Sequence, residues 1–486
     1  MSLLTAAALG ALAVLAFAPF ACAWSLPVVL AALLALAASC PPRRAAALGY
    51  AFGCGLFGAG TWWVYISMHG FGGAPWPLAL ALTLALTALL AAFPAAALGL
   101  TQTLVPAGRS AVLPRVLAFA GSWVLLEWLR GWFASGFPWL ALGYAATPTV
   151  LAGYAPLLGV FGASLIWTLL GGCLWGLTRR RWWPAPAALV LVGLGAGLQG
   201  VTWTQPTAEP LRVALLQGNV GQGQKWDPAQ VLPTLQRYRE LNRRAGAADL
   251  IVWPEVAVPV PYERLQGYFG QLQAERRPGQ TLLIGVLRPA PAGGYHNSVL
   301  ALDEGPHRFY DKVHLVPFGE YFPVPGFVRT QLALLDLPYT DMAFGARAQP
   351  PLAVDGQAVA VSICYEDLFG DELAAAAGAA TLLVNVSNDA WFGDSIAPHQ
   401  HLQIAQTRAL EFAKPLLRAT NTGITALVDH RGRVQARLPQ FELDMLAGRV
   451  QPRRGATPYA RVGDLPAVMG SLLLAVLAFG SARRRG

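Results

Sequence analysis

The stretch Val361-Ser362-Ile363-Cys364-Tyr365-Glu366-Asp367 is a short β-prone run that leads directly into a cysteine, with acidic residues close behind. This pattern predicts a buried strand ending on a thiol, at the strand-to-loop position where α/β enzymes place reactive groups. Cys364 is also the only cysteine after Cys173, so the polar part of the chain around it forms no internal disulfide. An isolated cysteine is more often a small buried hydrophobe than a nucleophile. The rest of the sequence has to decide between the two.

The composition of the 486 residues is not that of a soluble protein. Hydrophobic residues make up 55% and charged residues 13%, and the mean hydropathy is +0.44. The formal net charge of +9 is carried by arginine, because Lys225, Lys312 and Lys414 are the only lysines. The arginines stand in short clusters beside apolar runs and form no basic stripe with interleaved aromatic residues. These features predict a membrane protein, with no nucleic acid among its partners.

Eight apolar runs are candidates for membrane-spanning helices, each of which needs about 20 apolar residues to cross a bilayer. The first two runs are short for this purpose. Seven of the runs precede the polar part of the chain and one follows it: residues 3–18, 26–38, 45–67, 78–100, 112–128, 151–177, 185–201 and 465–479.

Arginine marks every second connection between these runs. By the positive-inside rule, the arginine-rich connections and both termini are expected in the cytoplasm. The odd number of preceding spans then places the polar segment on the opposite side, which in a bacterium is the periplasmic side of the inner membrane. The arginines that indicate this topology are Arg43, Arg44, Arg109, Arg115, Arg179, Arg180, Arg181, Arg483, Arg484 and Arg485.

The pattern changes at residue 211, where short β-rich runs begin to alternate with helical stretches. This alternation predicts α/β layers with functional groups at the carboxyl ends of strands. The expected domains are membrane helices over 1–203, a polar catalytic domain over 210–450 and a final membrane helix over 464–482. Expected strands are 211–217, 249–253, 281–286, 297–302, 358–364, 381–386 and 424–429, and expected helices are 230–245, 262–275, 370–377 and 401–412.

Three extended stretches of this domain end on Glu255, Lys312 and Cys364. A thiol is a poor nucleophile at neutral pH unless a base or a positive charge assists it. A carboxylate removes the thiol proton if partial burial raises the pKa of that carboxylate. An ammonium beside both stabilises the oxyanion of a tetrahedral intermediate. Taken singly, Glu255 could lie in the first turn of a helix and Lys312 could belong to a surface ion pair. The three residues together indicate an acyl-transfer site.

His399 and His401 form the other pair with chemical potential in this domain. An H-x-H pair with no second cysteine nearby is weak support for a metal site. We expect the pair to open the following helix and to order the neighbouring loop. No metal and no cofactor are therefore expected.

Longer motifs carry a resemblance to a known family. The Glu-Lys-Cys arrangement resembles that of the nitrilase (carbon–nitrogen hydrolase) superfamily, and within it the chain is most similar to the apolipoprotein N-acyltransferases. The resemblance covers nearly the whole chain, including the apolar runs on both sides. Its motifs are Trp253-Pro254-Glu255, Asp311-Lys312-Val313-His314-Leu315-Val316-Pro317-Phe318-Gly319-Glu320-Tyr321, Ile363-Cys364-Tyr365-Glu366, Asn385-Val386-Ser387-Asn388-Asp389-Ala390-Trp391-Phe392-Gly393-Asp394-Ser395 and Arg418-Ala419-Thr420-Asn421-Thr422-Gly423.

The resemblance implies an αββα sandwich standing on a multi-pass helical bundle of about eight spans. It implies a monomer in the bacterial inner membrane that transfers a fatty acyl chain from a phospholipid to the N-terminal amine of a diacylglyceryl-cysteine apolipoprotein. The catalytic residues of the family match Glu255, Lys312 and Cys364. The further residues that the family needs match Trp226, Glu320, Tyr365 and Glu366.

Two questions stay open at this point. The segment 317–345 is long, apolar and rich in helix breakers, so it is either a lid that dips into the bilayer or an insertion packed on the core of its own domain. The same three residues would also serve a membrane-tethered amidase or nitrilase, whose closed polar pocket would distinguish it from an acyltransferase. A transporter or scaffold with an inactive domain is disfavoured by the intact trio and by spans poor in charge.

Overall fold

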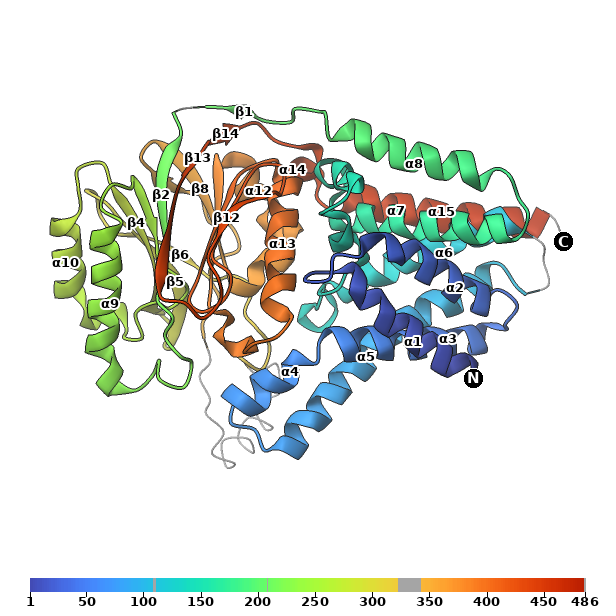
Figure 1. Ribbon diagram of the computed structural model, residues 1–486, viewed down its shortest axis with the longest axis horizontal. Helices are drawn as coiled ribbons and strands as arrows, with labels where there is room; N and C mark the ends of the chain where they lie inside the picture. Colours follow the sequence, from blue (N-terminus) through green and yellow to red (C-terminus); the bar gives the residue numbers. More distant parts are fainter. Residues whose placement is uncertain (108–110, 208, 322–341, 485–486) are drawn as a thin grey trace. The chain divides into compact units, whose positions relative to one another are not determined.

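The computed structural model describes residues 1–107, 111–207, 209–321 and 342–484 (Figure 1). The described chain divides into two compact units. Unit 1 consists of Met1–Trp203, Phe392–Phe412 and Thr457–Gly486, and unit 2 consists of Thr204–Trp391 and Ala413–Ala456. The segment Phe392–Phe412 of unit 1 lies inside the range expected for the polar domain. Most of the candidate lid, residues 322–341, lies outside the described residues.

Unit 1 is helical, and proline starts many of its helices. Proline occupies the first turn of α2, α3, α5, α7 and α8, where its missing N–H costs no hydrogen bond and its fixed φ suits a helix. The helices are α1 Ser2–Ala13, α2 Leu26–Ala37, α3 Pro42–Gly60, α4 Trp63–Tyr65, α5 Trp76–Leu104, α6 Val112–Arg130, α7 Ala155–Thr178, α8 Pro184–Leu198, α13 Ala397–Phe412, α14 Pro458–Val462 and α15 Leu465–Arg484.

Every apolar run expected to span the membrane lies largely in a helix, but the helices differ in length. Among the described helices, four are long and apolar enough to cross a bilayer: Trp76–Leu104, Val112–Arg130, Val150–Thr178 and Leu465–Arg483. Three others are apolar but shorter, namely Ser2–Ala16, Ala23–Ala37 and Pro184–Leu198. The structure thus gives four candidate spans, and the total of eight stays a prediction.

Within its described residues, unit 2 contains two six-stranded mixed sheets with parallel strands at their centres. Strands and helices form α/β layers, as the alternating pattern predicted. In the first sheet β2, β3 and β4 run parallel, and in the second β8, β9 and β10 do. The first sheet has the order β13-β2-β3-β4-β5-β6 and the second β12-β11-β10-β9-β8-β7. A two-residue ladder pairs β1 with β14. The strands are β1 Gln205–Pro206, β2 Leu211–Gln217, β3 Leu250–Val252, β4 Thr281–Pro289, β5 Tyr295–Leu302, β6 Arg308–Asp311, β7 Leu352–Val354, β8 Gln357–Ile363, β9 Leu382–Ser387, β10 Leu416–Thr420, β11 Ala426–Val428, β12 Val434–Arg437, β13 Asp444–Val450 and β14 Arg453–Arg454.

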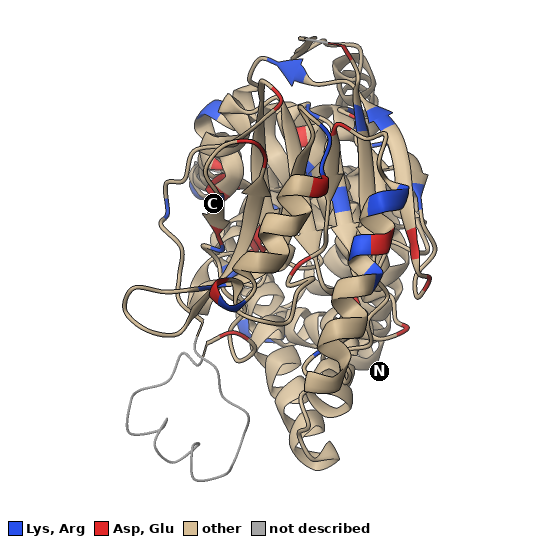
Figure 2. Ribbon diagram, turned by 90° about the vertical axis from the view of Figure 1, so that its left-hand side faces the viewer, with Lys and Arg blue, Asp and Glu red and all other residues tan. Residues whose placement is uncertain are grey.

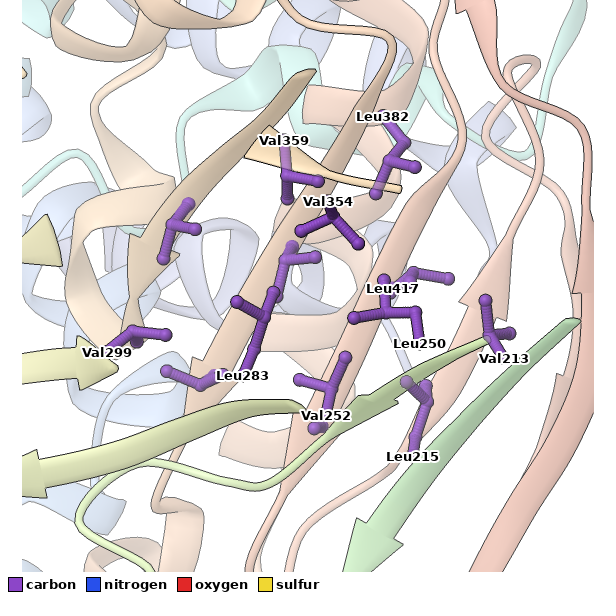
Figure 3. Close-up of a cluster of buried hydrophobic side chains, with 14 of the residues drawn as sticks. Val213, Leu215, Leu250, Val252, Leu283, Val299, Val354, Val359, Leu382 and Leu417 are labelled. Carbon is purple, nitrogen blue, oxygen red and sulfur yellow. The ribbon is translucent and has the colours of Figure 1, made fainter. Parts of the chain in front are cut away.

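The two sheets pack face to face through aliphatic side chains. Figure 3 shows the contact, with Val213, Leu215 and Val252 from the first sheet pointing toward Val359 and Leu417 from the second. All five side chains are buried, and each such aliphatic side chain stabilises the fold by about 1.5–3 kcal/mol. Because side chains alternate along a strand, the residues of β2 between these positions face the opposite way.

Those alternate residues pack under helices. Ala214 and Leu216 of β2 belong to a second core shared with Tyr238 of α9 (Val231–Arg244) and Leu272 of α10 (Gln266–Glu275). Figure 1 shows both helices on the outer face of the first sheet. On the second sheet α12 (Gly370–Ala379) packs against β8. Unit 2 therefore has the αββα layers that the resemblance implied.

In Figure 2, lysine and arginine alternate with aspartate and glutamate along the ribbon of unit 2. Several arginines of unit 2 are paired with carboxylates, including Arg212 with Asp249, Arg239 with Glu275 and Arg244 with Asp444. Pairs this exposed contribute little to stability, about 0–1 kcal/mol each. They show that this basic chain carries mixed charge on its α/β unit.

Candidate active site

Glu255 stands just beyond the carboxyl end of β3 in unit 2. The loop that carries it lies along β4, because Trp253 N–H donates to the Leu283 carbonyl at 2.8 Å and Ala257 N–H to the Gly285 carbonyl at 3.0 Å. Val256, directly after Glu255, has a φ of 42°. A β-branched residue in this left-handed region is strained by about 1–3 kcal/mol. The loop is therefore held by its surroundings in a conformation that it would not adopt alone.

Lys312 follows β6 and lies between two carboxylates. Its Nζ is 3.3 Å from Glu255 Oε1 and 2.9 Å from Glu320 Oε1. Asn297 on β5 joins the same two groups, since its Nδ2 donates to Glu255 Oε1 at 2.7 Å and to Glu320 Oε1 at 3.0 Å. Glu320 also accepts the Val316 N–H at 2.8 Å. Lys312 is 1% exposed, so these contacts act in a medium of low polarity, where charge pairs are strong.

Cys364 is the first residue after β8 and has a φ of 52°. Cys364 is thus, after Val256, a second non-glycine residue of the site with a strained backbone. Its positive φ turns the chain sharply from the strand into the 3₁₀ turn Cys364–Leu368. The charges that act on its thiol include those of Glu255, Lys312 and Asp389. The structure thus brings together the three residues that the sequence proposed as catalytic.

Burial and the charges in this cluster keep the thiol of Cys364 protonated. Burial raises the pKa of the Cys364 thiol well above its usual value, Glu255 raises it further, and Lys312 opposes the shift. Burial also raises the pKa of Glu255, but the ammonium groups of Lys312 and Lys225 and the amide of Asn297 outweigh it, so the pKa is lowered overall. The condition that partial burial raises the pKa of the carboxylate is not met at Glu255, because two buried cations face it. Glu255 is an ionised base beside a protonated thiol.

Glu366 links the turn that carries Cys364 to the loop that carries Lys312. Its Oε2 accepts the Ile363 N–H at 2.7 Å, and its Oε1 accepts the N–H groups of Val313 at 2.5 Å and His314 at 3.1 Å. Tyr310 OH donates to Oε2 at 3.0 Å. Burial raises the pKa of Glu366 to about 7 despite these donors. This carboxylate positions the nucleophile relative to the lysine.

The other two predicted residues differ in their placement. Tyr365 is buried, and its ring packs edge-on to Phe369 with centroids 5.3 Å apart. The side chain of Trp226 is 51% exposed and lies outside the buried cluster. Its neighbour Lys225 is buried instead, at 4% exposure.

The histidine pair lies in the other unit. His399 and His401 are part of α13, and the ring of His401 lies 5.5 Å from that of Trp139. Across the described residues, no group of three or more histidine, cysteine, aspartate or glutamate side chains is arranged to hold a metal ion.

Two family models match the chain, and together they cover most of it. The apolipoprotein N-acyltransferase N-terminal domain matches residues 9–173, and the carbon–nitrogen hydrolase domain matches residues 212–459. An apolipoprotein N-acyltransferase of Methylococcus capsulatus is 44% identical over 98% of this chain and 95% of its own length. The chain belongs to the apolipoprotein N-acyltransferase family.

Further relatives bear the same name. An apolipoprotein N-acyltransferase of Nitrosomonas europaea is 45% identical over 99% of this chain and 98% of its own length. Among solved structures, the C. elegans NitFhit protein is 17% identical, with a TM-score of 0.40 over 52% of this chain and 62% of that chain.

Several residues around the site of this apolipoprotein N-acyltransferase family member escaped the sequence-based prediction. Lys225, Asn297 and Asn388 reach Glu255 from three segments, and Asn388 N–H donates to Glu255 Oε2 at 2.8 Å. Arg418 pairs with Asp389 at 3.0 Å and with Asp367 at 3.3 Å, all fully buried. Only the scarcity of lysine singled out Lys225 beforehand. Asn388, Asp389 and Arg418 stand in the quoted family motifs but were given no role there, and Asn297 carries no local signal.

Proposed function

We propose that this chain is an acyltransferase that moves a fatty acyl chain from a membrane phospholipid to the N-terminal amine of a diacylglyceryl-cysteine apolipoprotein. Family membership supports the reaction class. The observation that carries the proposal is the buried cluster of unit 2, in which an ionised Glu255 and the Lys312 ammonium act on the Cys364 thiol. These are the parts of a covalent acyl-transfer site.

The first half-reaction forms a thioester. Glu255 accepts the proton from Cys364 Sγ as the sulfur attacks the ester carbonyl carbon of the phospholipid. The carbonyl oxygen becomes an oxyanion, which Lys312 and the backbone N–H of Tyr365 stabilise. The oxyanion collapses and the carbon–oxygen bond breaks, and the leaving lysophospholipid oxygen takes its proton from Glu255.

The proton transfer and the attack have to be coupled. The pKa of the thiol lies above its usual value and that of Glu255 lies below its own, so a free thiolate is unfavourable before the attack begins. The developing oxyanion attracts Lys312, which is held at 3.3 Å from Glu255. As the proton leaves sulfur, the negative charge moves toward this ammonium, and the attack compensates for the cost of ionisation.

The second half-reaction forms the amide. The apolipoprotein α-amine attacks the thioester carbon, and Glu255 accepts a proton from the amine nitrogen. The carbon–sulfur bond then breaks, and the thiolate of Cys364 regains its proton from Glu255. Because an amide is more stable than a thioester, this step makes the cycle run forward.

We further propose that the catalytic unit faces the periplasm of a bacterial inner membrane and that the enzyme acts as a monomer without a cofactor. Four candidate spans and the alternating arginine clusters support this placement. Holding the site at the membrane has a physical reason, since moving an acyl chain through water costs about 0.8 kcal/mol for each CH₂ group.

Purified full-length protein, a phospholipid with a labelled acyl chain and a synthetic diacylglyceryl-cysteine peptide test the function. The expected product is the N-acylated peptide, detected by mass spectrometry, together with lysophospholipid. Cys364→Ala, Glu255→Gln and Lys312→Met are each expected to abolish it. Release of free fatty acid with no acylated peptide, or turnover of a small amide instead, would refute the proposal.

A further inference from the structure

The loop before α9 reaches the site through a ladder of amide side chains. Asn421, which follows β10, donates from Nδ2 to the Val220 carbonyl at 2.7 Å and accepts the Val220 N–H at 3.0 Å. The same Nδ2 donates to Asn388 Oδ1 at 3.0 Å, and Asn388 Nδ2 donates to Gln222 Oε1 at 2.8 Å. Residues 220–222 are therefore fixed to the loops that follow β9 and β10.

This anchoring places Lys225 against Glu255. Lys225 N–H donates to the Gly221 carbonyl at 3.0 Å, which closes the loop into a turn. Its side chain is 4% exposed, and Nζ donates to the backbone carbonyl of Glu255 at 3.3 Å. A buried ammonium is costly unless it faces compensating charge. The proposed mechanism gives Lys225 no part, so its burial there calls for a function.

The balance of charges in the cluster suggests what Lys225 does. Glu255 and Glu320 carry two carboxylates, whereas Lys312 supplies a single ammonium between them. A net negative charge disfavours both an ionised Glu255 and a developing thiolate on Cys364. A second buried ammonium brings the four groups to neutrality.

We propose that Lys225 is a positioning residue whose buried ammonium balances the second carboxylate of the cluster and so keeps Glu255 ionised as the base for Cys364. This inference rests on the proposed function, because it takes Cys364 as the nucleophile. Lys225 acts through Glu255, in contrast to Lys312, which faces the reacting carbonyl.

The electrostatics around Lys225 agree with this role. Burial lowers the pKa of Lys225 to about 8, while Glu255 after β3 and Cys364 after β8 oppose the shift. Lys225 in turn is one of the two ammonium groups that lower the pKa of Glu255. The other is Lys312, which also pairs with Glu320. The charge of Lys225 therefore acts on the catalytic carboxylate and is lost as the pH rises through about 8.

The test is the pH dependence of Cys364 alkylation in the detergent-solubilised full chain, which requires no lipid substrate. Iodoacetamide is the probe, and the Cys364 peptide is quantified by mass spectrometry because four other cysteines are present. Lys225→Met removes the charge and the donor, whereas Lys225→Gln removes the charge and keeps a donor for the Glu255 carbonyl. Lys225→Arg retains the charge.

A matched control is Lys414→Met. Lys414 is also buried, and burial lowers its pKa to about 8, but its Nζ donates to the backbone carbonyls of Ala377, Gly378 and Ala380. We expect Lys225→Met and Lys225→Gln to raise the pKa of Glu255 and so to move the acid limb of the alkylation profile up by about one pH unit. On that limb alkylation then slows about tenfold, the effect of a one-unit pKa change. Lys225→Arg recovers most of the rate, and Lys414→Met lowers the melting temperature without altering the alkylation profile.

Wild-type alkylation in Lys225→Gln would overturn the inference, because only the hydrogen bond would then matter. The same holds if Lys414→Met shifts the profile equally. Should Lys225→Met fail to fold, the comparison of Lys225→Gln with Lys225→Arg decides. A shifted alkylation profile in a protein that acylates no peptide would instead refute the proposed function and leave the role of Lys225 standing.

Discussion

Gly285 on β4 is the clearest place to test whether the position of Glu255 limits the reaction. A Cβ atom at Gly285 would lie 2.2 Å from the Pro254 carbonyl oxygen, 2.6 Å from Val256 N and 2.8 Å from Glu255 Cα. Side chains do not approach backbone this closely, so Gly285→Ala has to push the loop away from β4 by about 1 Å. A displacement of that size at a catalytic group lowers the rate about 100-fold. Overpacking also costs about 1–3 kcal/mol of stability.

The assay is the single-turnover rate of acyl transfer from labelled phospholipid to Cys364, measured on folded, detergent-solubilised protein. Gly270→Ala is the matched control, because Gly270 is exposed on α10 and a Cβ there meets nothing within 4 Å. This control should keep the wild-type rate and gain about 0.5–1 kcal/mol from helix propensity. If Gly285→Ala folds and transfers the acyl chain within twofold of the wild-type rate, the position of this loop does not limit the chemistry and the reasoning is refuted.

Three further predictions concern the groups around the trio. Asn297 donates to Glu255 at 2.7 Å and to Glu320 at 3.0 Å, so Asn297→Asp places a third carboxylate against these two. The substitution should lower the single-turnover rate at least 100-fold, and a rate within threefold of the wild type would contradict this. Glu366→Gln turns an amide NH₂ toward buried donors such as Val313 N–H. It should lower the free energy of unfolding, measured by denaturant titration, by about 2–4 kcal/mol. Unchanged stability would show that these contacts are dispensable. The pKa of Glu366 is raised in the fold from 4.5 to about 7, so its contribution to stability is complete below pH 4.5 and is lost as the pH rises through about 7, a difference of about 3 kcal/mol. The wild type should therefore lose more stability than Glu366→Gln between pH 5 and pH 8, and equal losses would exclude this carboxyl as the cause.

Local patterns predicted the elements that carry the site. The strand expected over 211–217 is β2 Leu211–Gln217, and the strand expected over 358–364 is β8 Gln357–Ile363. Short apolar runs bounded by turn residues can be recognised without knowledge of the fold. Glu255, Lys312 and Cys364 stood out because each follows an extended run. Their mutual approach was implied by the resemblance and is present in the structure.

What could not be predicted depends on contacts between distant segments. Strand β10, Leu416–Thr420, was missed because Arg418 interrupts its apolar run. The two aspartates that neutralise this arginine come from the turns that follow β8 and β9. The lowered pKa of Glu255 could not be predicted for a similar reason, since Lys225 and Lys312 approach from segments 30 and 57 residues away. Charge compensation of this kind leaves no periodic signal in the sequence.

The measurement that tests the central claim most directly is the intact mass of the protein after incubation with a phospholipid of one defined acyl chain and no acceptor. The account predicts a single added acyl group on Cys364, labile to hydroxylamine, absent from Cys364→Ala and discharged when the diacylglyceryl peptide is added. An acylated peptide formed by a protein that never carries this adduct, or an adduct on another residue, would contradict it.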